Sequence, residues 1–503
     1  MGLLMALRRQ GRPDTLVGGG RHRLFPIRPY HVYIGLGSNL GCRAKNLKLA
    51  VEALNEPTIG HVQSISGLYQ SKAQYVIEQP DFLNAVCQIQ TTLSPFGLLD
   101  RLKEIERRLG RVKAAQRFGP RAVDLDILYY HEDEDPSRII TVARQGERNG
   151  SDEGSLFVPH TRLHEREFVL RPLAELAPWL SHPLRENLTV QQMLGACEKS
   201  RSETSSPLVR VLPLRWQEGD NMLLLPLDNK HRETPSLVMG ILNATPDSFS
   251  DGGKDGGCVN SAVERALGMR DQGATIIDIG GESTRPGASE VEEKEELGRV
   301  LPIIEGIRAQ DKNVLLSIDT RRAMIAQAAV EAGADVINDV SGGAFDSEML
   351  PAVAALNVPY VIMHTRGTPQ TMTEAAHTAY SRDPVGDVVR ELRRAVRRAE
   401  RKGVRRWSMI VDPGIGFAKD LETNIALLRG LDRLNEEIAG LPLLVGASRK
   451  RFIGTLCGET QADKRDVGTS VVNAVAILRG AALLRVHNVA MARQTVRLAD
   501  TLR

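Results

Sequence analysis

The chain of 503 residues has few of the residues that build cross-links or stacking surfaces. It holds five Cys, and no two of them form a Cys-x-x-Cys pair. This odd, scattered set argues against a disulfide framework or a structural zinc site and favours a reducing compartment. Aromatic residues make up 4% of the chain and the net charge is +3, so we expect no nucleic-acid partner.

Long apolar runs and two nucleotide-binding motifs are also missing. No apolar run approaches the ~18 residues of a membrane helix, so we expect no membrane partner. The sequence lacks the phosphate loop G-x-x-x-x-G-K-[ST], and GLGSNLG near residue 35 does not have dinucleotide-loop spacing. What remains is an ordinary globular composition, 42% hydrophobic and 25% charged, in a chain long enough for two or three domains.

The N-terminal segment 1–29 differs from the rest of the chain. It is rich in Arg, contains no Lys and carries a single acid, Asp14. Such a composition is typical of an organelle transit peptide, and we predict a mitochondrial destination. A disordered basic tail on a cytoplasmic protein is the alternative.

Residues 30–197 mix segments of strand and helix periodicity, which predicts a small α+β domain. Within it, the polar stretch 131–155 predicts an exposed insertion. Residues 198–236 begin as a polar linker and continue as two apolar pieces, VRVLPLRW and NMLLLPL. We predict that these pieces form a hairpin leading into the next domain.

Residues 237–503 contain eight short apolar runs that alternate with helical stretches. Near-continuous apolar runs are typical of strands buried on both faces of a parallel sheet, and eight such units predict an α/β TIM barrel, (β/α)8. Each run ends in polar or Gly residues, at the carboxyl ends where TIM barrels carry their active sites.

Polar residues at these strand ends suggest a ligand. Asp319, Asn338 and Asp412 come from three strands, and converging acids and amides suit a flat ligand with several N–H donors, although each could instead cap a helix or bond a strand end. Arg485 and His487 lie two apart on the last strand. As two potential cations beside a lysine they predict an anion pocket, unless Arg485 pairs with a local carboxylate.

Eight motifs of this half together resemble dihydropteroate synthase, over about residues 237–490. They are VMGILNATPDSFSDGG, IIDIGGESTRPGA, SIDT, VINDVSG, IMHTRGTP, DPGIGFAK, LVGASRK and RVHNV. The resemblance implies condensation of 6-hydroxymethyl-7,8-dihydropterin pyrophosphate with p-aminobenzoate. It implies pterin contacts at Asp319, Asn338, Met363, Asp412 and Lys450, with Lys450, Arg485 and His487 as catalytic residues. It implies pyrophosphate and p-aminobenzoate contacts at Asn243, Phe249, Thr284, Arg285, Pro286, Ser448, Arg485 and His487, with Mg²⁺ at Asn243.

Two acids in the N-terminal half also point to phosphate chemistry. Asp124 and Asp126 lie two apart on a predicted strand and so share a face. Close carboxylates repel unless a cation separates them, and Mg²⁺ favours carboxylate and phosphate oxygens. A basic stretch just upstream suits a nucleoside triphosphate. A pair of exposed strand acids is the alternative.

Four motifs over about residues 32–180 resemble 6-hydroxymethyl-7,8-dihydropterin pyrophosphokinase: YIGLGSNLG, QPDFLNAV, GRVKAAQRFGPRAVDLDIL and VPHTRLHEREFVLRPL. The resemblance implies a ferredoxin-like α+β fold, ATP as co-substrate and AMP as product. It implies Mg²⁺ ligands and catalytic residues at Asp124 and Asp126, with Arg121 also catalytic. It implies ATP contacts at Glu106, Arg111, Lys113, Arg121, His160 and Arg166, and pterin contacts at Phe82, Asn84 and Phe168. Plain core packing is the alternative for the two Phe residues.

The two resemblances support each other, because the product of the first reaction is the substrate of the second. The sequence therefore predicts a bifunctional folate-biosynthesis enzyme of the fused plant type, acting on small molecules and assembling as a homo-oligomer through the barrel. Two alternatives are a pterin-binding methyltransferase barrel and a non-catalytic pterin binder.

Overall fold

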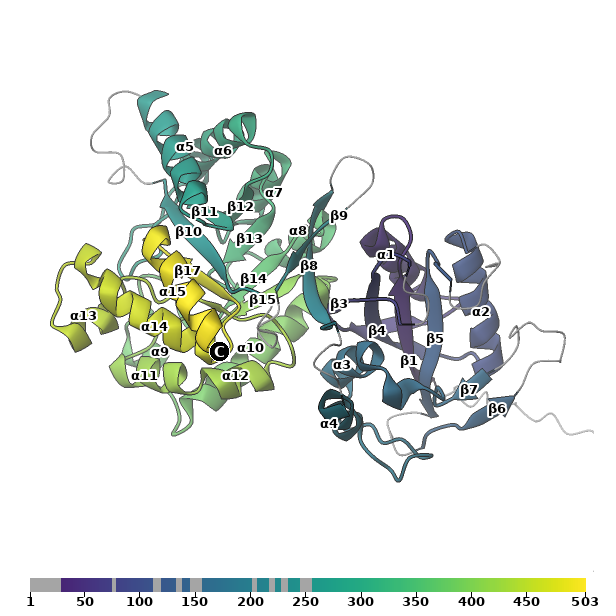
Figure 1. The fold of residues 1–503 in the computed structure, drawn as a ribbon. Helices are drawn as coiled ribbons and strands as arrows, with labels where there is room; N and C mark the ends of the chain where they lie inside the picture. Colours follow the sequence, from purple (N-terminus) through teal and green to yellow (C-terminus); the bar gives the residue numbers. More distant parts are fainter. Residues whose placement is uncertain are drawn as a thin grey trace, which may run out of the picture.

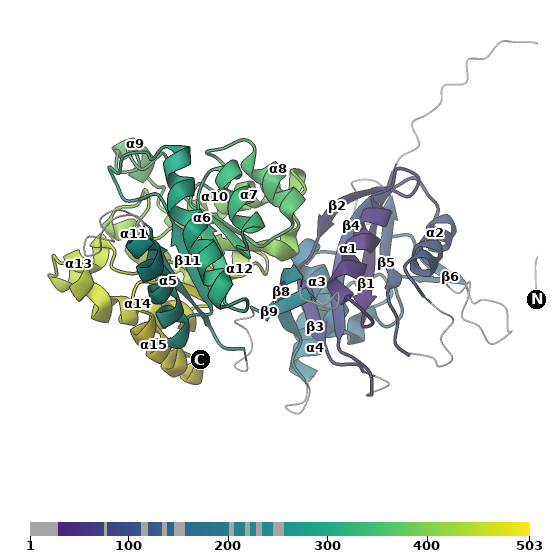
Figure 2. The same cartoon turned by 90° about the horizontal axis from the view of Figure 1, so that it is seen from above.

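The computed structural model describes residues 29–74, 78–111, 119–132, 138–144, 156–200, 206–216, 222–227, 234–244 and 256–503. They form an N-terminal α+β domain and a C-terminal barrel (Figures 1 and 2). Among the helices in these ranges, none combines the length and apolar character that crossing a bilayer would require.

The N-terminal domain is built on one antiparallel sheet with helices on both faces. Its own strands are β1 (Tyr30–Ser38), β2 (His61–Ile65), β3 (Leu68–Ser71), β4 (Phe82–Thr91) and β5 (Asp124–Glu132). One face packs on α1 (Arg43–Leu54) and α2 (Pro95–Arg108), and the other on α3 (Glu167–Leu176) and α4 (Val190–Ser200). Alternation along β1 explains this, since Val32 and Ile34 enter the first core and Tyr33 the second. The predicted α+β fold is confirmed.

The polar stretch 131–155 is only partly the exposed insertion that the sequence predicts. His131 belongs to β5 and is 5% exposed, because it lies opposite His31 of β1 and the two rings stack at 5.3 Å. Further along, β6 (Val142–Arg144) pairs with β7 (Leu156–Val158). Residues 133–137 and 145–155 lie outside the described residues.

The C-terminal domain is the predicted eight-stranded parallel barrel. Its strands are β10 (Leu237–Asn243), β11 (Ile276–Gly280), β12 (Leu315–Asp319), β13 (Val336–Asp339), β14 (Tyr360–Met363), β15 (Met409–Asp412), β16 (Leu444–Val445) and β17 (Leu483–Val486). A parallel bridge between Val411 and Leu443 closes the barrel between β15 and β16. Its helices are α5 (Gly256–Asp271), α6 (Glu293–Gln310), α7 (Ala323–Glu331), α8 (Met349–Leu356), α9 (Ala375–Thr378), α10 (Pro384–Arg401), α11 (Leu421–Arg429), α12 (Leu431–Glu437), α13 (Arg451–Cys457), α14 (Asp466–Leu478) and α15 (Val489–Leu502).

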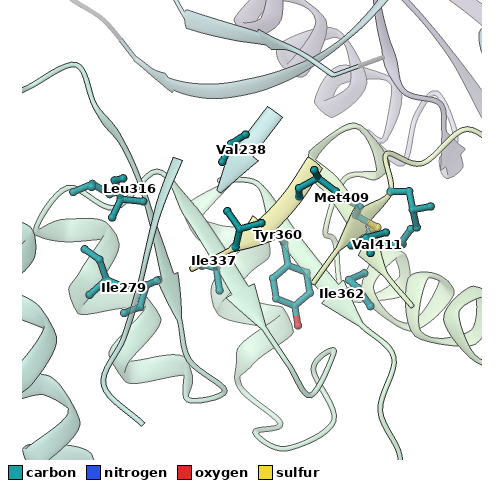
Figure 3. Packing of buried hydrophobic residues seen from close by; sticks show 14 of the residues in the cluster. Val238, Ile279, Leu316, Ile337, Tyr360, Ile362, Met409 and Val411 are labelled. Atoms are coloured by element: carbon teal, nitrogen blue, oxygen red, sulfur yellow. The ribbon is translucent and has the colours of Figure 1, made fainter. Parts of the chain in front are cut away.

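Strand side chains that point away from the barrel axis form the main core against these helices. Figure 3 shows part of this layer, in which Ile279, Leu316, Ile337 and Ile362 are fully buried. Burying a side chain of this size contributes about 1.5–3 kcal/mol, so this layer holds the strand ends that carry the polar residues in fixed positions.

The predicted hairpin forms, but it joins the first domain as well as leading to the second. Its strands are β8 (Val209–Trp216) and β9 (Met222–Pro226), and β8 pairs with β3 to extend the N-terminal sheet. Leu212 and Leu214 pack against the first residues of the barrel strands, including Ile276 and Leu315. The hairpin therefore plugs the amino end of the barrel and lies between the two domains (Figure 1).

A buried charge cluster fixes the domains against each other beside this plug. The Glu175 carboxylate on α3 is 4% exposed and lies 3.1 Å from Nη1 of Arg210 on β8. It also lies 3.5 Å from Nε of Arg406 in the barrel. Arg210 donates in addition to the backbone carbonyl of Gly440. Removing one partner from a buried ion pair costs about 3–5 kcal/mol, so a substitution of Glu175 by an apolar residue would weaken this junction.

Candidate active sites

A pocket in the N-terminal domain opens between the sheet and residues 160–169. Most of the predicted kinase-site residues line it: Phe82, Asn84, Arg121, Asp124, Asp126, His160, Arg166 and Phe168. The sheet register explains this convergence. Asp124 of β5 and Asn84 of β4 both lie opposite Gly37 of β1.

Two glycines that the sequence analysis missed form part of the pocket wall. Gly35 and Gly37 line the pocket on β1, opposite Asp126 and Asp124 respectively. A Cβ on Gly37 would lie 3.8 Å from Oδ1 of Asn84 and 3.9 Å from Cβ of Asp124. Side chains here would fill the space between the acids and the amide. The signal in the sequence was two glycines at strand spacing in GLG.

The two acids of β5 have different surroundings. Asp124 accepts from Nη1 of Arg111 at 3.0 Å and from Nη1 of Arg121 at 2.8 Å. Burial raises the pKa of Asp124, but Arg121, Lys103 and Arg111 together hold it below its usual value. Asp126 shares its face and lines the same pocket. This gives a pair of carboxylates facing one cavity.

Glu106 and Arg111 do not lie on the pocket wall, although the resemblance implies direct ATP contacts for both. Glu106 is fully buried, and its carboxylate accepts from the backbone N–H of Leu125 at 2.9 Å and pairs with Arg111. Burial raises the pKa of Glu106. In this structure Glu106 supports Arg111, which in turn contacts Asp124. The predicted ATP contact Lys113 falls in residues 112–118, outside the described residues.

The predicted pterin residues lie on two sides of the pocket. Asn84 donates through Nδ2 to Oγ of Ser71 at 2.9 Å and to the carbonyl of Tyr69 at 3.2 Å, which fixes its amide. Phe82 and Phe168 both line the pocket, so neither is only core packing. Burial lowers the pKa of His160 despite the nearby Asp126.

In the barrel, the predicted residues meet at the carboxyl ends of the strands. Arg485 donates from Nε to Asp278 at 2.6 Å and from Nη2 to Asp319 at 2.5 Å. Asn338 donates to the same oxygen of Asp278 at 3.1 Å. Pairing of Arg485 with local carboxylates, the alternative in the sequence analysis, is therefore what the structure shows.

Asp278 is the residue of this cluster that the sequence analysis missed. It lies within the apolar run TIIDIGG and is fully buried, so its pattern resembles a core strand. The crowded acids have a consequence for Asp319. Burial raises the pKa of Asp319 to about 7. The charge of Arg485 lowers this pKa in part, and the charge of Asp278 raises it further.

Asp412 and Lys450 face one another across the loop that follows β15. Asp412 accepts from the backbone N–H of Gly414 at 2.7 Å. Lys450 donates to the carbonyl of Ile415, and its Nζ lies 3.9 Å from the centroid of the Phe417 ring. Burial lowers the pKa of Lys450 to about 7. The predicted contact Met363 is paired in register with Asp412 on the neighbouring strand.

His487 does not provide the positive charge that the sequence analysis expects from it. Its Nδ1 lies 2.9 Å from Oγ of Ser448. Burial, together with Arg449, Arg485 and Arg285, lowers the pKa of His487 to about 3. The imidazole of the free protein is therefore neutral near pH 7, and the cations of this mouth are guanidinium and ammonium groups.

The loop after β11 carries three further predicted residues. Thr284 is half-buried, and Arg285 and Pro286 are exposed. The backbone N–H of Gly287 donates to the carbonyl of Pro369, which joins this loop to the one after β14. Asn243 is the half-buried last residue of β10, and Phe249 lies outside the described residues. Within the described parts of the chain, no three His, Cys, Asp or Glu residues form a metal-binding group.

Comparisons with known proteins match each of the two domains to a family. Residues 33–178 match the family 7,8-dihydro-6-hydroxymethylpterin-pyrophosphokinase, and residues 239–487 match the family of pterin binding enzymes. The "Folate synthesis bifunctional protein" of Arabidopsis thaliana is 39% identical over 94% of this chain and 96% of that protein. The chain belongs to the bifunctional folate synthesis family. A mitochondrial member from Pisum sativum is also 39% identical, over 89% of its length. The chain spans only 59% of fol1 from Schizosaccharomyces pombe.

Solved structures support the same assignment. A dihydropteroate synthase from Xanthomonas albilineans with 4-aminobenzoic acid is 40% identical over 58% of this chain and 98% of that one, with a TM-score of 0.50. A two-domain protein from Plasmodium falciparum covers 94% of this chain and 95% of that one, with a TM-score of 0.70 at 21% identity, and so supports the fold.

The chain is thus a bifunctional enzyme, a dihydropterin pyrophosphokinase that uses ATP and a dihydropteroate synthase. The predicted family and both predicted activities are confirmed. Neither alternative for the barrel, methyltransferase or passive binder, gains support from these comparisons.

The neutral state of His487 can be measured. Because the pKa of its imidazole is lowered to about 3, its NMR signals should stay those of a neutral ring down to about pH 5, with His487→Asn providing the assignment. Added pyrophosphate should raise this pKa, because a nearby anion favours the charged ring. A titration midpoint of about 6.5 in the free enzyme would contradict the buried geometry.

Proposed function

We propose that the pocket of the N-terminal domain is where pyrophosphate passes from ATP to 6-hydroxymethyl-7,8-dihydropterin. The observation that carries this is the convergence of two acids, two Phe residues and four cationic or imidazole side chains (Lys72, Arg121, His160 and Arg166) on one cavity. Phe82 and Phe168 stack on the pterin ring and Asn84 hydrogen-bonds its edge. Arg121, His160 and Arg166 bind the phosphates. The pterin hydroxyl oxygen attacks the β-phosphorus and AMP leaves.

Mg²⁺ fits the two carboxylates of β5. Asp124 and Asp126 present hard oxygen donors on one face toward the phosphate side of the cavity, and the neighbouring arginines keep Asp124 ionised. When bound, Mg²⁺ would neutralise charge on the phosphate oxygens. Glu106 acts through Arg111, which it holds against Asp124.

At the mouth of the barrel, the pterin pyrophosphate lies across the strand ends. Asp412 accepts hydrogen bonds from the guanidine-like edge of the ring, and Asp319, Asn338, Met363 and Lys450 surround it. Arg485 has further N–H donors besides the two that it gives to Asp278 and Asp319. With these, and together with His487 and Asn243, it binds the pyrophosphate, and Asn243 is also a ligand for Mg²⁺. These three residues stabilise the leaving pyrophosphate anion while positive charge develops on the methylene carbon of the pterin.

p-Aminobenzoate then completes the reaction from the side of Thr284, Arg285, Pro286 and Ser448. Its amine nitrogen forms the new C–N bond as the C–O bond to pyrophosphate breaks, and the amine proton is released. The loop that carries the first three of these residues is joined to the loop after β14 by the hydrogen bond from Gly287 to Pro369, which supports this placement.

The two activities should be separable by one substitution. Asp126→Asn in the full chain should lower AMP formation at least about a hundredfold. The reason is that the Mg²⁺ proposed to neutralise the phosphate oxygens would lose one of its two carboxylate ligands. Dihydropteroate formation from supplied pterin pyrophosphate and p-aminobenzoate should be unchanged. Asp100→Asn, at an exposed site on α2, serves as the control and should leave both rates unchanged. Loss of both activities in Asp126→Asn, or of neither, would contradict the assignment of this pocket.

We propose further that the enzyme is a homo-oligomer and that α14 forms the contact. Val467, Val471, Val475 and Leu478 lie along one stripe of α14 with exposed fractions between 38% and 70%. Leu498 and Leu502 are exposed on α15, which lies beside α14 (Figure 1). Apolar residues gathered in this way mark interaction surfaces, and a second copy would supply the same apolar surface.

Sedimentation can test this contact. Val471→Asp should reduce the mass in solution to that of one chain, because a buried carboxylate at the contact has no partner. The control Met324→Asp changes an equally apolar, exposed residue on α7 and should keep the wild-type mass. A Val471→Asp protein of unchanged mass would exclude α14 as the contact.

We also propose that the Arg-rich segment 1–29 directs the protein to mitochondria. Two relatives, from Pisum sativum and Arabidopsis thaliana, carry the word mitochondrial in their names, and another from Arabidopsis thaliana does not. A fluorescent protein fused behind residues 1–29 should accumulate in mitochondria, and cytoplasmic fluorescence would refute the assignment.

A further inference from the structure

A buried lysine lies behind the proposed pterin site without a role in the reaction. Lys419 is 8% exposed and is the residue before the N-cap of α11. Its Nζ donates to the carbonyl of Phe417 at 2.8 Å and lies 3.0 Å from Nδ1 of His364, the residue after β14. The lysine therefore ties the loop after β15 to the end of β14.

The hydrogen-bond partners fix the state of His364. When Lys419 is charged, its ammonium group only donates, so Nδ1 of His364 accepts from Lys419. Its Nε2 must then carry the proton and donate to Glu391 on α10, at 3.0 Å. Burial and Lys419 lower the pKa of His364 to about 4, which agrees with a neutral ring. Glu391 also accepts from Nε of Arg366 at 3.1 Å.

This chain of contacts supports the groups proposed to hold the pterin. Lys419 donates to the backbone carbonyl of Phe417, and the ring of the same residue lies under the ammonium group of Lys450. Gly414 has a φ of +65°, and a Cβ there would lie 1.9 Å from the carbonyl oxygen of His364. The loop is thus pressed against His364 at one end and tied to it by Lys419 at the other.

Lys419 also acts on Asp412 through its charge. Burial raises the pKa of Asp412, while the N–H of Gly414 and the cations of Lys450, Arg485 and Lys419 lower it. Burial lowers the pKa of Lys419 itself to about 7, and the groups that act on it are Asp412, Lys450, Arg366 and Glu391. Its charge is thus present below about pH 7, in the range where a buried carboxyl would take up a proton.

We propose that Lys419 is a positioning residue for the synthase: it fixes the loop under Lys450 and supplies the buried charge that keeps Asp412 a hydrogen-bond acceptor for the pterin. The inference rests on the proposed contact between Asp412 and the pterin ring. Lys419 itself touches neither substrate in this account.

The test is the pH dependence of substrate binding in the full chain with Lys419→Met. We expect the KM for pterin pyrophosphate to rise at least about tenfold near pH 6, where Lys419 is charged in the wild type, and much less near pH 9, where the wild-type lysine is already neutral. The kcat should change less than KM. The kinase rate of the same preparation should be unchanged, and the exposed Lys402→Met should leave both activities as in the wild type.

Several outcomes would overturn the inference. One is a KM ratio between Lys419→Met and wild type that is constant with pH, and another is an unchanged KM with only a lower melting temperature. If Asp412→Asn leaves the KM unchanged, the proposed pterin contact fails instead. If Asp412→Asn raises KM but Lys419→Met keeps its pH-dependent effect in that background, the charge does not act through Asp412 and the inference is wrong.

A second variant covers the case in which Lys419→Met does not fold. Glu391 is partly exposed and raises the pKa of Lys419. Glu391→Gln should therefore also raise the KM for pterin pyrophosphate, but by a smaller factor and only at the acid end of the pH range tested. An unchanged KM over the whole pH range in this variant would also count against the inference.

Discussion

Burial of one apolar hairpin against two domains is the constraint on which the rest of this molecule depends. The strand β8 completes the N-terminal sheet by pairing with β3, and its Leu212 and Leu214 fill the amino end of the barrel. Without the hairpin, the open barrel end would expose apolar side chains to water, and the edge of the N-terminal sheet would offer unpaired N–H and C=O groups to other chains. The buried Glu175, between Arg210 and Arg406, adds charge pairing to the same junction.

Both active sites balance burial against charge, but in different ways. In the kinase pocket, Arg111 and Arg121 both donate to Asp124, and together with Lys103 they hold its pKa below the usual value. This suits a site that receives metal and phosphate. At the barrel mouth, acids and cations are nearly matched and deeply buried. The pKa values of Asp319 and Lys450 are both shifted to about 7. Shifted pKa values of this kind gather at functional sites.

Periodicity and local spacing predicted much of this structure. Eight apolar runs became the eight barrel strands, and Asp-x-Asp on β5 placed both acids on one face, because a strand alternates its side chains. Asp278 escaped notice because a single acid in an apolar run does not reveal that it faces the barrel axis. The roles of Glu106 and His487 depend on burial and on neighbours distant in sequence, as does the pairing of β8 with β3. Local patterns carry no information on such contacts.

The plug at the amino end of the barrel also decides how the two reactions can be linked in space. The synthase mouth is at the carboxyl end, and the hairpin side chains close the opposite end. Among the described residues, these side chains block the barrel axis at the end that faces the kinase domain. Any passage of the intermediate between the two sites, direct or through solvent, would therefore run outside the barrel. What the covalent linkage guarantees is stoichiometry: every kinase domain is made together with one synthase domain.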